Sequence, residues 1–385
     1  MKKNAEFSPD IIHLHHVGGR GGSASISIPS SLKAEMAQVL YEADVSATQH
    51  AIENSKDGVI VMPLCIADKR RHLSFNLNYC PYTSSIFPLN QKYADAHHLQ
   101  DGADFIYEEV MKPHDIKNIE SHALDDLVAE GTTPPVDFLS IDTQGAELLV
   151  LKGAERSIRE TVVAIEVEVN LVDLYLGSST FSETDKFLRD RGFSLASLST
   201  IPIGRGRVPK KLRGRGSPLQ GEATYLLDQQ NFSHKELDTS DINRLKNLAL
   251  ISLIAGFTEV TFIIMQRYRD ALSNALDPST KIGKFLLETQ EFLLVEEKKS
   301  TPELWHNLYS LTDSWDRFKP GQKANNRLSR LLNVPFSDKE RTKLISKLRR
   351  LVVKLLPQTR FERFLSRHGL KLAADHVRAR RSSKI

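Results

Sequence analysis

The first 230 residues alternate short apolar runs with amphipathic stretches. Runs of Val, Ile, Leu and aromatic residues predict β-strands. The stretches between them repeat apolar positions every three or four residues, as helices do. Strand alternating with helix predicts an α/β fold with a doubly wound and mainly parallel sheet. The strands are expected at residues 10–17, 39–44, 58–67, 73–79, 136–142, 162–170, 193–199 and 222–228. The helices are expected at residues 30–38, 47–55, 121–131, 147–160 and 182–192.

The pattern changes near residue 230. Residues 236–385 show helical periodicity throughout, including the stretches 243–257, 281–297, 301–318 and 340–356. A loop rich in Gly and Arg, at residues 203–218, belongs to the first of these two regions. We therefore expect two domains, an α/β domain at 1–232 and an α-helical C-terminal domain at 233–385.

One apolar segment, at residues 248–265, is long enough to raise the question of a membrane span. It carries Glu259 near its middle, and an ionised carboxylate is costly in lipid. We expect a buried core helix there and no transmembrane span. A membrane-surface or partner-facing helix is the alternative.

Charge is concentrated at one end of the chain. Residues 338–385 hold 15 Lys and Arg against 4 Asp and Glu, a net charge of +11, whereas the whole chain carries +4. This basic helical tail suits packing on its own domain, an acidic surface, a protein partner or a homo-oligomer. Its few aromatic residues disfavour nucleic-acid binding. The two cysteines, Cys65 and Cys80, predict neither a disulfide framework nor a metal site, and no apolar leader follows the start, so a cytoplasmic location is expected.

Acidic residues end several predicted strands. A glycine cluster, Gly18 to Gly22, follows the first strand, where glycine lets the backbone approach a ligand closely. Glu42 ends the second strand, Asp68 the third and Asp142 a later one. An acid about 20 residues beyond a glycine-rich turn is placed to bind a ribose diol. Each acid alone is an ordinary solvated residue, but the series favours a cofactor that contains adenosine.

The stretch DFLSIDTQGAELLVLKGA, at residues 137–154, resembles the pattern DFLKIDVEGAELEVLKGA of the FkbM-type methyltransferase family, which depends on S-adenosylmethionine. HVGGRGG, VLYEAD, SHALDDL and FLRDRGFSL resemble further family segments in the same order, so that the resemblance covers about residues 10–228. It implies a Rossmann-like methyltransferase sheet of seven strands. The chain departs from the family at His16, where the pattern has Asp, and at Ser140, where it has Lys.

The resemblance also implies an activity, namely methylation of a hydroxyl oxygen on a sugar, glycan or related metabolite. It assigns cofactor binding to the residues at the strand ends, His16, Gly18, Gly22, Glu42, Asp68 and Asp142. Asp142 and Glu168 are the candidate catalytic residues, and Glu166 points the same way as Glu168 by the period of a strand. For both glutamates a structural ion pair is the alternative, and His114 is a weaker candidate base.

Two further hypotheses concern the acceptor and the class of protein. The four arginines of the loop at 203–218 suit an acidic or phosphate-bearing acceptor through their planar donor groups. A mobile solvated loop is the alternative. The chain as a whole has a rival interpretation, a non-catalytic adenosine-binding scaffold whose basic helical half binds a protein partner or an acidic surface.

Overall fold

The computed structural model describes residues 11–18, 26, 28–44, 47–48, 52, 59–98, 105–206, 208–209, 212, 214–233 and 236–299. The expected helix at 47–55 lies mostly outside these residues, and the basic tail, Gly22, Arg207 and Arg213 lie wholly outside them. Residues described up to Gln290 form one compact unit.

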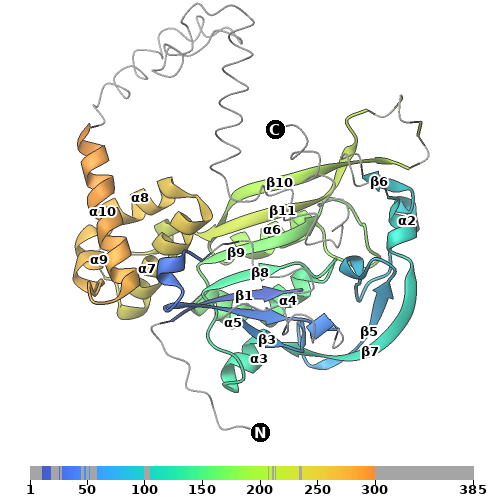
Figure 1. Cartoon of the computed structure of the whole chain (residues 1–385), viewed down its shortest axis with the longest axis horizontal. Helices are drawn as coiled ribbons and strands as arrows, with labels where there is room; N and C mark the ends of the chain where they lie inside the picture. The colour runs from blue at the N-terminus through green and yellow to red at the C-terminus, as the bar shows by residue number, and fades with distance from the viewer. Residues whose placement is uncertain are drawn as a thin grey trace, which may run out of the picture. The chain divides into compact units, whose positions relative to one another are not determined.

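A mostly parallel central sheet with flanking helices forms this unit (Figure 1). Its strand order is β3-β2-β1-β8-β9-β11-β10-β6. The five strands from β3 to β9 are parallel, and β11, β10 and β6 are each antiparallel to the strand before them. The α/β fold class is thus confirmed, and the central sheet has eight strands where the family resemblance implied seven. The strands are β1 Ile12–Val17, β2 Met36–Tyr41, β3 Val59–Met62, β6 Ala96–His98, β8 Phe138–Ile141, β9 Ala164–Asn170, β10 Phe193–Arg205 and β11 Ser217–Leu227.

A second sheet of three strands lies beside the first and curves away from it in Figure 1. It contains β4 Cys65–Ala67, β5 Arg71–Asn78 and β7 Pro113–Ala123, with β7 in the centre. The expected single strand at 58–67 is therefore wrong. Pro63 has no amide hydrogen to donate to a ladder, and the chain leaves the central sheet there and enters the second one.

The helices follow the strands in the predicted alternation, with one exception. At the expected helix 30–38, a short 3-10 turn, Ser30–Leu32, leads directly into β2. The partners of β2 on both sides, β1 and β3, explain this, because sheet pairing outweighs a weak helical pattern. The helices are α2 Tyr107–Val110, α3 Leu124–Ala129, α4 Glu147–Gly153, α5 Glu155–Glu160, α6 Phe181–Arg189, α7 Thr239–Ala255, α8 Thr258–Arg267, α9 Arg269–Ala275 and α10 Lys281–Lys299.

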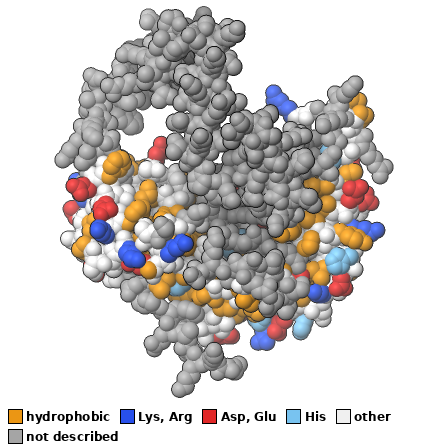
Figure 2. Space-filling view, viewed as in Figure 1, with side chains coloured by type: hydrophobic (Ala, Val, Ile, Leu, Met, Phe, Trp, Pro, Cys, Tyr) orange, Lys and Arg blue, Asp and Glu red, His pale blue; other side chains and the backbone are white. Residues whose placement is uncertain are grey.

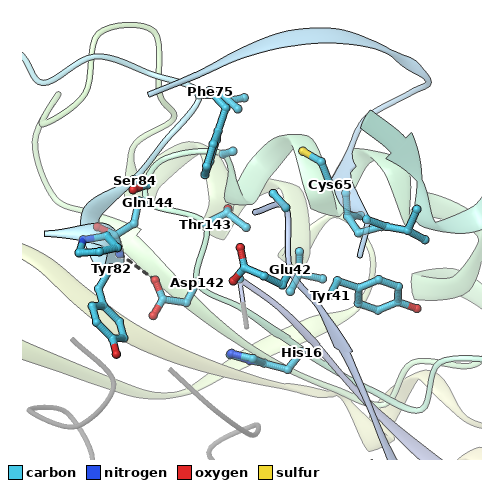
Figure 3. Close-up of a pocket in the computed structure, with 18 residues that line it drawn as sticks. His16, Tyr41, Glu42, Cys65, Phe75, Tyr82, Ser84, Asp142, Thr143 and Gln144 are labelled. Carbon is cyan, nitrogen blue, oxygen red and sulfur yellow. Dashed lines mark hydrogen bonds between the residues drawn. The ribbon is translucent and has the colours of Figure 1, made fainter. Parts of the chain in front are cut away.

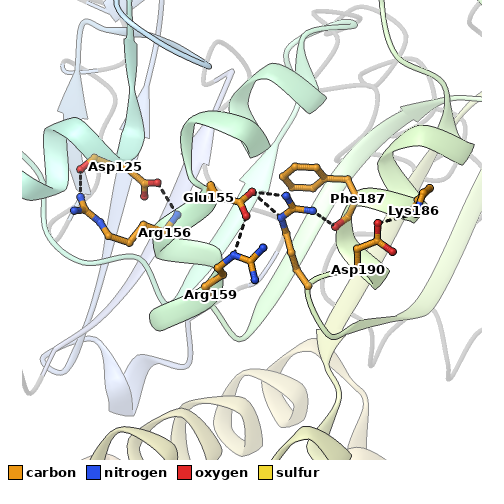
Figure 4. Close-up of polar contacts among 8 residues, drawn as sticks. Asp125, Glu155, Arg156, Arg159, Lys186, Phe187 and Asp190 are labelled. Atoms are coloured by element: carbon orange, nitrogen blue, oxygen red, sulfur yellow. Dashed lines mark hydrogen bonds and ion pairs between the residues drawn. The ribbon is translucent and has the colours of Figure 1, made fainter.

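Ion pairs and caps join α3, α5 and α6 (Figure 4). The Asp125 carboxylate accepts hydrogen bonds from the amides of Arg156 and Ser157, which open α5. Glu155 binds Arg191, whose guanidinium lies 3.4 Å from the centre of the Phe187 ring. These contacts fix the helices that follow β8 and β9, and so they fix the strand ends that carry the candidate site.

The apolar segment 248–265 spans two helices, the end of α7 and most of α8, and not a single continuous helix. Gly256 adopts a left-handed conformation, φ 90°, which ends α7, and α8 begins two residues later. Thr261 donates a hydrogen bond to the carbonyl of Ala249, so that the two helices pack face to face. Leu248, Ile251 and Ile264 are buried, so the segment lies in the core as predicted, although as two helices and not one. Among the described residues, none of the helices has the length and apolar character needed to cross a membrane.

Helix α7 packs against β9 and β11 of the central sheet. The proposed division of the chain at 232/233 stays a prediction, since the structure shows contact between its two sides without showing whether each folds alone. On the face drawn in Figure 2, acidic and basic side chains are interspersed over the described surface.

Candidate active site

Three parallel strands end at one place, and Gly18 brings their ends together. Gly18 follows β1, has φ 98° and donates its amide to the carbonyl of Tyr41 at the end of β2. The amide of Asp142, after β8, donates to the carbonyl of Val17. A Cβ on Gly18 would lie 1.7 Å from the carbonyl oxygen of Asp142, so only glycine fits between these backbones.

A cleft opens at these strand ends (Figure 3). It holds about 840 Å³ of empty space, part of it open to solvent. Its lining includes His16, Gly18, Tyr41, Glu42, Leu64, Cys65, Ile66, Phe75, Tyr82, Ser84, Ile86, Asp142, Thr143 and Gln144. The carboxyl ends of the strands therefore meet at a cavity, which is where open α/β sheets bind their ligands.

Glu42 follows β2 directly and lines the cleft, although its side chain is largely buried. The amide of Asp44 donates to Glu42 Oε1 at 2.7 Å, which fixes the direction of the carboxylate. Asp44 is itself paired with Lys117. The lone pairs of Glu42 suit a neighbouring pair of hydroxyls, and the apolar side chains of Leu64, Ile66 and Phe75 suit a flat ring. The Glu42 carboxylate and these apolar side chains therefore fit the adenosine portion of S-adenosylmethionine.

His16 lies in the same cleft, where the family pattern has an acid. Its Nδ1 shares a hydrogen bond of 2.9 Å with the hydroxyl of Ser140, its partner on β8. A histidine–serine cross-strand pair therefore stands at the two positions where the pattern has Asp and Lys. Figure 3 shows the ring below the carboxylates of Asp142 and Glu42.

Asp142 and Glu168 are brought together by a residue that the sequence analysis did not single out. Gln144 Nε2 donates to Asp142 Oδ1 at 2.8 Å and to Glu168 Oε2 at 2.7 Å. Burial, followed by the charges of Asp142 and Glu147, raises the pKa of Glu168 well above its usual range. Glu168 lies on β9 and is not among the residues that line the cleft.

Glu147 has the structural role expected of an acid in the first turn of a helix. Its Oε1 accepts hydrogen bonds from the amides of Thr143 and Gly145 at 3.0 and 2.9 Å. Burial raises its pKa to about 7, against the lowering effect of these amides. The carboxylate stabilises the turn after β8 and complements the α4 dipole.

Other candidates from the sequence lie elsewhere. Asp68 follows β4 and pairs with Arg71 at 2.6 Å, and it is not among the residues that line the cleft. His114 is an exposed residue of β7 that contacts Tyr79. Arg205 pairs with Asp95 at the start of the Gly- and Arg-rich loop. Within the described residues, we find no His, Cys, Asp and Glu cluster able to hold a metal.

Known proteins were compared with the chain. Residues 33–195 match the family model of the methyltransferase FkbM domain. A search of the curated proteins found no match. A crystal structure of methyltransferase FkbM from Methylobacillus flagellatus KT aligns at 14% identity over 58% of this chain, with a TM-score of 0.28. The alignment spans 45% of that protein's chain, less than half of its length.

The family match covers the elements that form most of the cleft. It begins just before β2 and ends within β10, and thereby includes Glu42, Asp142 and Glu168. It agrees with the family predicted from the 137–154 motif. Residues 33–195 of this chain are therefore similar to the methyltransferase FkbM domain family.

Proposed function

We propose that the protein is a methyltransferase that uses S-adenosylmethionine. The observation that carries the proposal is the cleft at the carboxyl ends of β1, β2 and β8, with Glu42 on one wall and Asp142 on another, inside a methyltransferase FkbM domain. When bound, S-adenosylmethionine supplies an activated methyl group together with its own leaving group. The protein's own task is then to bind, to align and to accept a proton.

Each cleft residue has a defined part in this proposal. Glu42 accepts hydrogen bonds from the ribose hydroxyls, and Leu64, Ile66 and Phe75 contact the adenine ring. His16 and Gly18 lie beside the remainder of the cofactor. Asp142 and Glu168 orient the acceptor hydroxyl and take up its proton, since a carboxyl with a raised pKa is suited to proton transfer near neutral pH.

The acceptor that we propose is a hydroxyl on a sugar, glycan or related metabolite. Tyr82 supports this choice, because its ring stands next to the Asp142 carboxylate in Figure 3 and offers a flat face to a carbohydrate ring. A phosphate-bearing acceptor remains part of the hypothesis through the loop at 203–218, of which Arg205 and Arg215 are described.

Calorimetric titration with S-adenosylmethionine tests the cofactor. We expect saturable binding to the full chain and a loss of at least about tenfold in affinity in Glu42→Gln, because one face of the ribose loses a charged acceptor. Glu130→Gln, an exposed change at the end of α3, is the matched control and should bind as the wild type does. No binding at millimolar cofactor would reject the proposal in favour of a non-catalytic scaffold.

A further inference from the structure

Gln144 stands at the centre of the carboxylate group described above. Its Nε2 carries two hydrogens, and one amide thus serves both Asp142 and Glu168. Its Oε1 accepts a hydrogen bond from the hydroxyl of Tyr175 at 2.7 Å. The side chain is 5% exposed, and every polar atom of its amide is used. The amide orientation is therefore fixed from both ends.

The backbone of Gln144 is also held in an unusual state. Its φ is 57°, and no other described non-glycine residue has a positive φ. Such a conformation costs free energy for a residue with a Cβ and needs support from its surroundings. The support comes from Ser85, whose hydroxyl donates to the Gln144 carbonyl at 2.6 Å. Main chain and side chain are thus anchored separately.

The charge of this residue decides what it can do. The family pattern quoted for residues 137–154 has Glu at the position of Gln144 and Lys at that of Ser140. A glutamate of the same shape cannot donate to two carboxylates, whereas the glutamine amide can. This chain therefore has uncharged hydrogen-bonding side chains, Gln144 and Ser140, at two positions near Asp142 where the pattern has charged ones.

Several ionisable groups face Glu168. Asp142 and Glu147 lie on the β8 side, Glu222 is its partner on β11, and the hydroxyls of Tyr107 and Tyr175 lie nearby. Glu147 is satisfied by backbone amides of its own turn. Close carboxylates in a dehydrated place do not all ionise together, and one of the pair retains a proton.

We propose that Gln144 is a positioning residue that aligns Asp142 and Glu168 through one amide, as a pair which holds a single proton. The role of this pair in methyl transfer rests on the proposed function. The acceptor oxygen forms its bond to the methyl group while the sulfur–methyl bond breaks, and the sulfur leaves as a neutral thioether. The hydroxyl proton passes to the ionised carboxyl of the pair.

Infrared pH titration of the full chain without cofactor tests the alignment directly. A protonated carboxyl has its own carbonyl stretching band. Subtracting the spectrum of Glu168→Gln from that of the wild type at neutral pH should leave one such band, which separates Glu168 from Glu147. In Gln144→Leu, the loss of a donor to the ionised form should move the midpoint of this band upward by about one pH unit. An unchanged midpoint would overturn the proposal.

Two more variants separate alignment from folding. Ser85→Ala removes the backbone anchor but leaves the amide donors, and its midpoint should match that of the wild type. Gln144→Glu keeps the shape and adds a negative charge, so its midpoint should rise at least as far as in Gln144→Leu; a fall would overturn the proposal. If the chain binds no S-adenosylmethionine, the proposed function is rejected. The infrared measurements need no cofactor, so they test the alignment of Asp142 and Glu168 independently.

Discussion

Gly18 is the residue on which the meeting of three strands depends. Its replacement by alanine would place a methyl group against the backbone of Asp142 and also impose a strained φ. Two other glycines separate these effects. Gly256 has φ 90° but open space around its Cβ position, and Gly214 has open space with no positive φ.

We predict a graded loss of stability in these three alanine variants. Gly18→Ala should lower the free energy of unfolding by roughly 3 kcal/mol or more. Gly256→Ala should cost about 1 kcal/mol, from backbone strain alone. Gly214→Ala should stay within roughly 0.5 kcal/mol of wild type. Urea denaturation measures all three, and equal losses for Gly18 and Gly214 would contradict the close packing.

Strand β1 is buried along its whole length although it contains three histidines. His15 Nδ1 hydrogen-bonds the hydroxyl of Tyr41 at 3.0 Å, and this hydroxyl also contacts Thr133 Oγ1. Burial lowers the pKa of His15 to about 3 and that of His13 to about 4. Both histidines are therefore neutral in the folded protein near pH 7.

We predict that acid weakens the fold through these histidines. The unfolded chain binds protons at histidine near pH 6.5, before the folded chain does, so stability falls as the pH drops from about 6.5 toward 4. The pKa of Asp137, raised to about 6 by burial, acts oppositely but over a smaller interval. His15→Gln should flatten the fall by on the order of 2 kcal/mol or more. Denaturation at a series of pH values measures the slope, and an unchanged slope would contradict this account.

At the residue scale, the sequence predicted part of the site. Glu42 and Asp142 are each found beside the cleft because each follows a recognisable apolar strand. Gln144 was missed, because its importance depends on Tyr175 and Ser85, which are distant in the sequence. The one local signal was its place between Asp142 and Gly145, where a turn after a strand needs positive φ.

At the scale of elements, helix α7 is tied to the start of β8. Asn247 Nδ2 donates to Asp137 Oδ1 at 2.8 Å, and the amide of His13 donates to Asp137 Oδ2. Asp137 is nearly buried, so each donor offsets the cost of placing its carboxylate away from water.

We predict that Asn247→Ala lowers the free energy of unfolding by about 1–3 kcal/mol at pH 7, because it leaves Asp137 without a partner on α7. The loss should shrink below pH 6, where Asp137 becomes protonated. Asn274→Ala, an exposed change on α9, is the control. A loss that does not vary with pH would argue against a charged Asp137 as the cause.

Element prediction succeeded where the pattern was long and failed where pairing decided the outcome. The strands β1, β8 and β9 and the helices α3, α6 and α7 lie where their periodicity placed them. Residues 30–38 carried a helical pattern, yet β2 begins inside them because β1 and β3 flank it. The crossing from β3 to β4 at Pro63 transferred Asp68 from the expected strand end to the second sheet.

At the scale of the whole molecule, the order of the strands explains why the site exists. β1 lies between β2 and β8, although about 120 residues separate the ends of β1 and β8 in the sequence. Such a reversal of direction in the strand order opens a crevice at the carboxyl ends. Local patterns predict the strands but not their order, which the structure supplies.

The central claim is that this crevice binds S-adenosylmethionine in one orientation. A crystal structure of the full chain with S-adenosylhomocysteine tests it most directly. We predict ribose hydroxyls on the Glu42 carboxylate, the adenine ring against Phe75 and Ile66, and the sulfur on the side of the cleft where Asp142 and Gln144 lie. A nucleoside bound outside the cleft, or a cleft left empty at saturating ligand, would contradict the account.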